Sequence, residues 1–422
     1  MSKCVTRPTK IKQIGRVVTG STPPTRHSEY FGDEYLFIKP SDLVKDQRYI
    51  CSTQTKLSRR GYDYLEKQVL PRNSVCVVCI GTLGKSCMTK GPSFTNQQIN
   101  SIIVDESKYN PHFIFYLLKL NIPKVKLLDC GSASGRENVN KSSFESIELE
   151  IPELPIQERI ARVLLVFDDL IEQNLERIKL LEEIVQMLYR EWFVCFRFPG
   201  YDGIKMVPSK LGMIPDGWNV KRLGGVVDNI VLGGTPSRKR PRLWEDGTIP
   251  WMKSGKLNDV RVIEGSEMIT SVGLSSSAAK LMPKRTVLIA ITGAILVSLS
   301  EIELCANQSV VGIYGSKELI QEYIYLFEVE NVNQLISKMS GSAQQHVNKE
   351  IVENSLILVP DLDVMEKFNE VAKPIFDLIS NLLFKNKNLG KARDLLLPNL
   401  ISGEIDISEL NLMAIDHGIL RR

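Results

Sequence analysis

The sequence predicts an α+β protein: two similar mixed α/β domains separated by two long antiparallel coiled-coil helices, with a pseudo-twofold internal repeat. Three observations predict this class. Short motifs recur in the same order about 210 residues apart. Each copy mixes short apolar runs with turn residues. Each copy then continues into a long stretch with apolar residues at alternating spacings of four and three. The chain of 422 residues is also too long for one ordinary core.

The repeat is carried by six pairs of segments. They are Gly20–Pro23 with Gly233–Pro236, Phe37–Leu43 with Trp251–Leu257, Leu70–Gly84 with Met282–Leu296, Thr95–Gln97 with Ala306–Gln308, Gly131–Lys141 with Gly341–Lys349, and Glu148–Pro152 with Leu356–Pro360. Self-similarity at a fixed spacing is typical of a duplicated structural unit. We therefore expect two copies of one module.

Within the first copy we expect strands in Tyr35–Ile38, Val69–Ile80 and Ile99–Val104, and one short helix in Pro111–Leu120. These lengths predict a mixed sheet with few helices. The expected boundaries are 1–153 for the first domain, 154–200 for the first spacer helix, 201–361 for the second domain, and 362–422 for the second spacer helix with a C-terminal tail.

The two long helices should pair through heptad seams, and Pro155 suits the first turn of the first one. The first seam comprises Ile160, Leu164, Phe167, Ile171, Asn174, Ile178, Leu181, Val185, Leu188 and Trp192. The second comprises Phe368, Ala372, Ile375, Ile379, Leu382, Asn386, Leu389, Arg393, Leu396 and Leu400. A lone helix with such a stripe leaves apolar residues in water, so we expect antiparallel pairing. The alternative is that each helix lies on its own sheet. Full overlap places Asn174 opposite Asn386, and we predict that this polar pair sets the register.

The composition is that of a globular protein. Hydrophobic residues make up 43% and charged residues 24% of the chain, and no apolar run reaches the roughly 20 residues of a membrane helix. Met1 to Lys12 lacks the apolar stretch of a signal peptide, and the eight cysteines are scattered. We therefore expect a cytoplasmic protein with reduced thiols. A net charge of +4 permits a polyanionic partner.

Neither cysteines nor histidines predict a metal site. Cys76 and Cys79 are three residues apart on an expected strand, so their side chains should point to opposite faces. The four histidines lie far apart and near no other ligand at metal-binding spacing. We expect no metal and no cofactor.

The segment Gly81 to Ser86 looks like a phosphate-binding loop. A Walker A loop needs a glycine five residues before Gly84, where this sequence has Cys79. The second copy has no lysine at the position of Lys85. What recurs is a strand followed by a tight glycine turn. A P-loop-like nucleotide hydrolase that uses Lys85 remains an alternative.

Several segments, taken together and in order, look like the DNA-specificity subunit of type I restriction-modification systems. They are Cys79–Lys85, Thr95–Ile99, Leu154–Leu164, Tyr189–Gly200, Leu211–Gly224 and Leu395–Ile407. The resemblance covers nearly the whole chain. One departure is that the first copy has no counterpart of Leu211–Trp218.

The resemblance implies two target recognition domains, each reading half of a bipartite, asymmetric double-stranded DNA site, with the helices as a spacer. It implies docking to two methyltransferase (modification) subunits that use S-adenosylmethionine to methylate adenine N6, and through them to ATP-driven restriction/translocase subunits. The chain itself should then be non-catalytic, and it contains no NPPY-like methylation motif. A coiled-coil adaptor that binds only proteins is the other alternative.

DNA binding needs cations for phosphates and amides or guanidiniums for base edges. The most basic loop follows Gly234 and contains Arg238, Lys239 and Arg240, whereas its counterpart in the first copy contributes mainly Arg26. Such divergence between matched positions is what two different half-sites require.

Residues that recur in both copies are better suited to structure or to phosphates than to base reading, because base readers should differ. Lys39 recurs as Lys253, and Asn140 recurs as Asn348. The candidates for base reading are the unlike residues Arg136 in the first copy and Gln344, Gln345 and His346 in the second. Lys85 is included as a further candidate cation.

Overall fold

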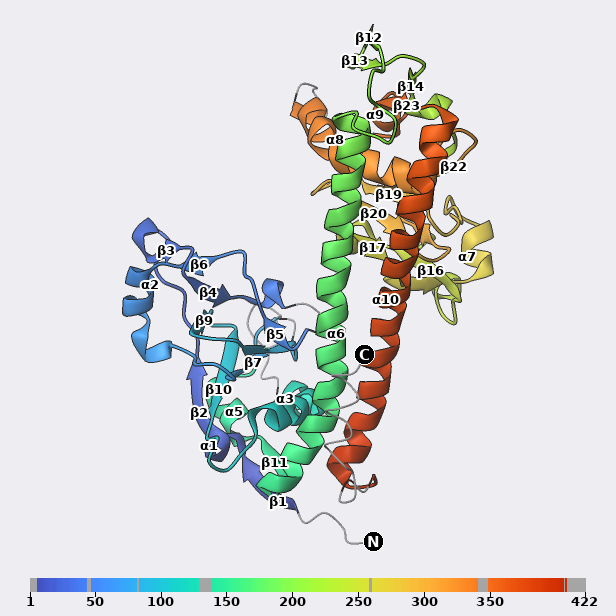
Figure 1. Cartoon of the computed structure of the whole chain (residues 1–422). Helices are drawn as coiled ribbons and strands as arrows, with labels where there is room; N and C mark the ends of the chain where they lie inside the picture. Colours follow the sequence, from blue (N-terminus) through green and yellow to red (C-terminus); the bar gives the residue numbers. More distant parts are fainter. Residues whose placement is uncertain are drawn as a thin grey trace. The chain divides into compact units, whose positions relative to one another are not determined.

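The computed structural model describes residues 6–43, 47–81, 83–128, 138–257, 260–340, 348–405 and 407. The chain divides into two compact units: unit 1 contains Met1–Asn174 and Lys385–Arg422, and unit 2 contains Leu175–Phe384. Helix α6 (Leu154–Tyr189) and helix α10 (Leu362–Ser402) each contribute one part to each unit (Figure 1). Within the described ranges, no helix combines the length and the apolar character of a membrane span.

Unit 1 is built around a five-stranded sheet with the order β2-β10-β7-β8-β5 and a four-stranded sheet with the order β3-β6-β4-β9. The first contains β2 (Gly15–Thr19), β10 (Ile99–Val104), β7 (Val75–Val78), β8 (Ser86–Thr89) and β5 (Tyr49–Ile50). The second contains β3 (Phe31–Gly32), β6 (Lys56–Leu57), β4 (Tyr35–Ile38) and β9 (Ser93–Thr95). A separate pair joins β1 (Thr6–Lys10) to β11 (Glu148–Pro152), directly before α6.

Unit 2 repeats the order of the five-stranded sheet in β15-β22-β19-β20-β17 and that of the pair β1-β11 in β14-β23. Its three-stranded sheet β18-β16-β21 corresponds to β6-β4-β9 of the four-stranded sheet. The five-stranded sheet contains β15 (Val227–Leu232), β22 (Val310–Ser316), β19 (Val287–Ala290), β20 (Leu296–Ser300) and β17 (Arg261–Val262). The other strands are β18 (Glu267–Ile269), β16 (Ile249–Met252), β21 (Cys305–Ala306), β14 (Asn219–Arg222) and β23 (Leu356–Val359). The predicted duplication is confirmed by this shared strand order.

The hairpin of β12 (Met206–Ser209) and β13 (Gly212–Pro215) has no counterpart among the strands described in unit 1. Its second strand, β13, falls on Leu211–Trp218, the segment that the first copy lacks in sequence. The hairpin follows a π-helical turn, Arg190–Val194, that extends α6.

The predicted helix Pro111–Leu120 is confirmed as α3. Unit 1 also contains α1 (Ile11–Ile14), α2 (Arg59–Tyr64), α4 (Ile122–Leu127) and α5 (Lys141–Ser146), and unit 2 contains α7 (Ser271–Ser275), α8 (Gln321–Ser340) and α9 (Lys349–Glu353). The expectation of a single short helix in the first copy was therefore wrong. Helices of one or two turns hold too few residues for a periodic pattern to appear. The expected strand Val69–Ile80 is shortened to β7.

Short 3-10 turns complete both units. They are η1 (Ser28–Tyr30), η2 (Pro40–Asp42) and η3 (Glu66–Gln68) in unit 1, and η5 (Leu223–Gly225), η6 (Pro241–Leu243) and η7 (Ser254–Lys256) in unit 2. The matched positions of η1 and η6, and of η2 and η7, extend the repeat from the sheets into the loops.

The long helices pack on each other and on the domain core in both units. In unit 1, Leu164 of α6 and Leu400 of α10 are buried in one cluster with Phe113 of α3. In unit 2, Trp192 of the π-helical turn and Phe368 of α10 have ring centroids 5.6 Å apart, in a cluster that includes residues of α8. The two alternatives raised by the sequence, pairing of the helices or packing on a sheet, are both realised.

The α6 and α10 segments of unit 1 run antiparallel. Nδ2 of Asn174 donates to Oδ1 of Asn386 at 2.7 Å, and Nδ2 of Asn386 donates to the carbonyl oxygen of Ile171 at 3.3 Å. Earlier on α6 and later on α10, Asp168 pairs with Arg393, and both side chains are 2% exposed. The two seam asparagines thus lie side by side, and that they set the register remains a proposal.

We predict that Asn174→Leu combined with Asn386→Leu stabilises unit 1 by about 1–2 kcal/mol, because buried polar pairs in a seam cost stability relative to leucine. Asn174→Leu alone should instead cost about 1–3 kcal/mol, since Oδ1 of the half-buried Asn386 loses its donor. Urea denaturation of the full chain measures both. A double variant less stable than the single variant would contradict the proposed role.

Candidate nucleic-acid interface

The recurring segments Gly20–Pro23 and Gly233–Pro236 each begin with a glycine that lies against the backbone of a neighbouring strand region. A Cβ atom on Gly20 would lie 2.1 Å from the Thr95 carbonyl oxygen, and one on Gly233 would lie 2.2 Å from that of Asn307. Only glycine permits such an approach. The motif therefore recurs because the backbone needs it.

The recurring amides complete the same turn. Oγ1 of Thr22 and Oε1 of Gln97 lie 2.8 Å apart, and Oγ1 of Thr235 and Oε1 of Gln308 lie 2.6 Å apart. The side chain of Asn96 accepts from the backbone N–H of Gln98 at 3.1 Å. These contacts favour the structural role expected for amides that are preserved between copies.

Lys39 and Lys253 directly follow matched strands, β4 and β16. Nζ of Lys39 donates to Oγ1 of Thr55 at 2.7 Å. In unit 2, Nζ of Lys253 forms an ion pair with Glu267. The register explains the match, because Phe37 lies opposite Thr55 as Trp251 lies opposite Glu267. A lysine with a different partner therefore occupies the same place in each unit.

Arg238 is held in a defined orientation at this place in unit 2. Its guanidinium lies 3.5 Å from the ring centroid of Trp244 and 5.0 Å from that of Trp251. Its Nη1 pairs with Oε2 of Glu267, while Lys253 pairs with Oε1. The hydrogen bond from Arg238, together with Lys253, lowers the pKa of Glu267 below its usual value. The group is therefore charged at neutral pH and keeps both cations in place.

The other cations of the two loops differ in their contacts. Nε of Arg26 donates to Nε2 of His27 at 3.2 Å, and Nδ1 of that histidine lies 3.0 Å from Glu29. Lys239 and Arg240 are exposed. In the described part of the chain, their side chains take part in no hydrogen bond or ion pair. Both are therefore available to a polyanion.

Lys85 and Asn140 are engaged within unit 1. Nζ of Lys85 donates to the carbonyl oxygens of Pro40 and Leu43 at 3.3 and 3.2 Å. The side-chain oxygen of Asn140 caps α5 by accepting from the Ser143 N–H at 2.8 Å, and Asn348 caps α9 in the same way. Arg136, Gln344, Gln345 and His346 lie outside the described residues.

The strand before Lys85 continues into another strand. Strand β7 pairs antiparallel with β8, with Val77 opposite Ser86. A P-loop instead leads into a helix whose N-terminus faces the phosphates. A cavity of about 370 Å³ beside Lys85 also contains Arg48 and Arg393. However, both arginines pair with carboxylates of α6. This geometry does not favour the hydrolase alternative.

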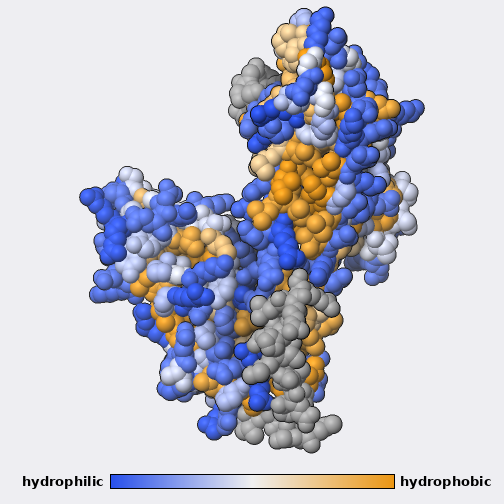
Figure 2. Space-filling model, in the orientation of Figure 1, coloured by the Kyte–Doolittle hydropathy of each residue, from blue (hydrophilic) through white to orange (hydrophobic). Residues whose placement is uncertain are grey.

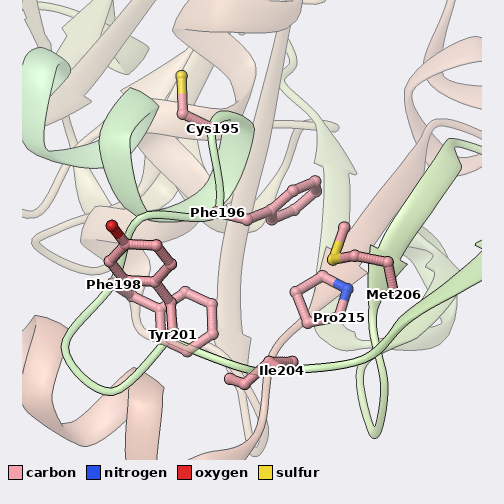
Figure 3. Close-up of a pocket in the computed structure, with 7 residues that line it drawn as sticks. All are labelled: Cys195, Phe196, Phe198, Tyr201, Ile204, Met206 and Pro215. Atoms are coloured by element: carbon pink, nitrogen blue, oxygen red, sulfur yellow. The ribbon is translucent and has the colours of Figure 1, made fainter.

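A second cavity, of about 240 Å³, lies in unit 2 next to the hairpin (Figure 3). It is lined by Cys195, Phe196, Phe198, Tyr201, Ile204, Met206 and Pro215. None of these side chains is charged, so the cavity does not suit a phosphate. Across the described residues, no group of three or more histidine, cysteine or acidic side chains is placed to hold a metal ion.

A family model described as "Type I restriction modification DNA specificity domain" matches residues 7–183 and again residues 215–388. The chain belongs to this family. The two matches fall on the two copies of the repeat, so the specificity subunit carries the family's domain twice.

Relatives support the assignment over nearly the whole chain. The type I restriction enzyme MjaIX specificity subunit of Methanocaldococcus jannaschii is 28% identical over 95% of this chain and 94% of its own length. The type I restriction enzyme HindI specificity subunit of Haemophilus influenzae is 34% identical over 41% of this chain and 38% of its own. The crystal structure of a type I restriction-modification S subunit from M. genitalium shares the fold, with a TM-score of 0.53 and 14% identity, covering 95% of this chain and 97% of that one.

Sequence reasoning missed several residues of this specificity subunit. Glu267 and Thr55 occupy matched positions but have no chemistry in common, so no motif marks them. Their positions follow from strand register, which a sequence pattern does not supply. Trp244 and Trp251, which stack on Arg238, could have been suspected from their place in and beside a basic loop.

Proposed function

We propose that this specificity subunit selects a bipartite, asymmetric double-stranded DNA target for a type I restriction-modification complex. Each unit contributes one reader, and the long helices act as the spacer between the half-sites. The observation that carries the proposal is one fold present twice, with the same lysine at one position and different cations around it. A shared phosphate contact with unlike neighbours is what two different half-sites require.

The partner proposal rests on exposed apolar side chains of the helices. In unit 2, Leu180, Ile184 and Met187 of α6 are 44–57% exposed at helical spacing, and Val371 and Leu378 of α10 are each 47% exposed. Figure 2 shows apolar residues gathered on one face of this unit. Contiguous exposed apolar surface marks protein interfaces. We assign it to a methyltransferase subunit; two such subunits methylate adenine N6, and restriction/translocase subunits join through them.

The chain is proposed to catalyse no reaction and to act in the cytoplasm, where the methyltransferase and the host DNA meet. Chemistry then depends on S-adenosylmethionine and ATP held by other subunits. A coiled-coil adaptor is the competing function, because the same apolar helix surface could bind proteins alone. Affinity for DNA at low salt separates the two.

The deciding experiment maps N6-methyladenine in a host that otherwise lacks it, expressing the neighbouring methyltransferase gene with or without this chain. We expect methylation at one split, asymmetric motif only when both are present. Methylation that is independent of this chain, or no DNA affinity at low salt, would overturn the proposed function.

The exposed loop cations should act on phosphates. We predict that Lys239→Ala combined with Arg240→Ala weakens binding of the assembled complex about equally at all DNA sequences. The negative slope of log affinity against log salt should become shallower by about 2 units, one for each lost phosphate contact. Lys391→Ala, an exposed position on α10, is the control and should leave the slope unchanged. A change confined to one base pair would contradict a phosphate role.

A further inference from the structure

The two units carry one matched site with different side chains, which we call the lysine site. In unit 1 it consists of Thr25, Lys39 and Thr55, and in unit 2 of Arg238, Lys253 and Glu267. Strand register matches Thr55 to Glu267. The loops match through a shared turn: His27 N donates to Pro24 O in unit 1, and Arg240 N donates to Ser237 O in unit 2. Thr25 and Arg238 each directly follow the accepting residue and so occupy matched positions.

We propose, building on the proposed function, that Arg238 reads a guanine in the half-site of unit 2, that Glu267 positions it, and that Lys39 and Lys253 contact phosphates in both units. Arg238 is therefore a specificity-determining residue, and Glu267 acts through it.

The contacts of Arg238 leave the geometry that a guanine needs. Glu267 takes one nitrogen, Nη1, and Trp244 covers one face of the planar group. Among the described residues, its other nitrogens take part in no hydrogen bond. The side chain is still 46% exposed. A guanidinium fixed in this way offers paired N–H donors to the O6 and N7 acceptors of guanine, with little entropy left to lose.

The two cations of this site suit different partners. The planar guanidinium of Arg238 presents paired donors that match the O6 and N7 acceptors of guanine, whereas the ammonium of Lys253 is a point charge that suits a single phosphate oxygen. Each carboxylate oxygen of Glu267 pairs with one of the two cations, so Glu267 holds them in place and does not accept hydrogen bonds from DNA. In unit 1 Lys39 is held by the neutral Thr55 instead, which leaves its full charge for a phosphate.

Unit 1 has Thr25 at the position matched to Arg238, which supports a base-reading role for Arg238 and a phosphate-binding role for the shared lysine. Thr25 cannot make a bidentate contact to guanine, while the lysine is common to both units. A residue that differs between copies can account for different half-sites, and one that is shared cannot. The lysine site therefore contains a common anchor and a variable reader.

The test uses the assembled complex with short duplexes that carry its mapped motif. Each guanine on either strand of the motif is replaced in turn by 7-deazaguanine, which lacks the N7 acceptor. We expect one replacement to weaken binding of the unaltered protein about ten-fold. Arg238→Ala should bind the normal and modified duplexes equally.

Variants at neighbouring positions separate reading from folding. Glu267→Gln should reduce the ten-fold discrimination at that guanine, while Glu267→Asp should restore part of it. A purely structural role of Glu267 would instead weaken binding to both duplexes and lower the melting temperature. Lys253→Met should weaken all duplexes alike, and Arg240→Ala, the matched control on the same loop, should keep the discrimination.

Three results would overturn the inference. Arg238→Ala could still discriminate against the 7-deazaguanine duplex, or it could lose the same affinity for every duplex. In the third, no guanine replacement in the half-site of unit 2 weakens binding of the unaltered protein. Unchanged recognition of the other half-site shows that each variant is folded. If the unaltered complex recognises no split motif, it is the proposed function that fails, and the two failures remain distinguishable.

Discussion

Replacing Arg393 by methionine should lower the free energy of unfolding of unit 1 by about 3–5 kcal/mol, the usual cost of leaving one member of a buried ion pair alone. Arg393 and Asp168 are each 2% exposed. The Tyr116 hydroxyl also donates to Asp168, and burial raises the pKa of this tyrosine. Without the arginine, the carboxylate keeps one neutral donor and an unpaired buried charge. Urea denaturation of the full chain, followed by the fluorescence or circular dichroism of the folded state, measures the loss.

The matched controls isolate the charge from the loss of packing. Lys391→Met lies on the same helix and is exposed, so it should change stability by no more than about 0.5 kcal/mol. Asp168→Leu combined with Arg393→Met removes both charges and should recover most of the stability. If the double variant is no more stable than Arg393→Met alone, the unpaired carboxylate is not the cause.

Gly233→Ala should destabilise unit 2 by about 3 kcal/mol, at the upper end for inserting one methyl group into a packed site. Its Cβ atom would lie 2.2 Å from the Asn307 carbonyl oxygen and 2.3 Å from that of Ala306. Both obstacles are backbone atoms of a strand region and cannot rotate away. The turn that carries Thr235 and Arg238 must then shift, so we expect DNA affinity to fall as well. Thermal unfolding together with binding measures both effects.

Gly255→Ala is the matched control in the same unit, because nothing lies within 4 Å of its added Cβ atom. It should leave stability unchanged or raise it by up to about 1 kcal/mol, through the smaller entropy of the unfolded chain. The duplication adds an internal replicate: Gly20→Ala should harm unit 1 as Gly233→Ala harms unit 2. A Gly233→Ala variant as stable as Gly255→Ala would show that the close approach relaxes at little cost.

The parts that sequence reasoning predicted well are those with periodic or repeated patterns. The helix Pro111–Leu120 and the strand Ile99–Val104 match α3 and β10. The long helices were expected because each seam repeats its apolar residues at helical spacing over many turns. One- and two-turn helices such as α2 were missed for the opposite reason.

The candidate site was predicted less completely. Arg238, Lys253 and Lys39 were visible as recurring or clustered cations, and the structure brings the first two together on Glu267. It ties Lys85 to backbone carbonyls and uses Asn140 as a helix cap. No sequence pattern indicated Glu267, since it lies 14 residues along the chain from Lys253 and 29 from Arg238, the two cations it holds.

From the amino-acid order alone follow the duplication, the long amphipathic helices and the family. All of these depend on residues close together in the chain or on comparison of one copy with the other. Only the tertiary structure decided which charges meet. Arg393 pairs with Asp168, which lies 225 positions away in the sequence, and Arg261 is buried between Glu182 and Glu301. Such pairs depend on register and burial, because a charge is stabilised in the interior only where the fold delivers its partner.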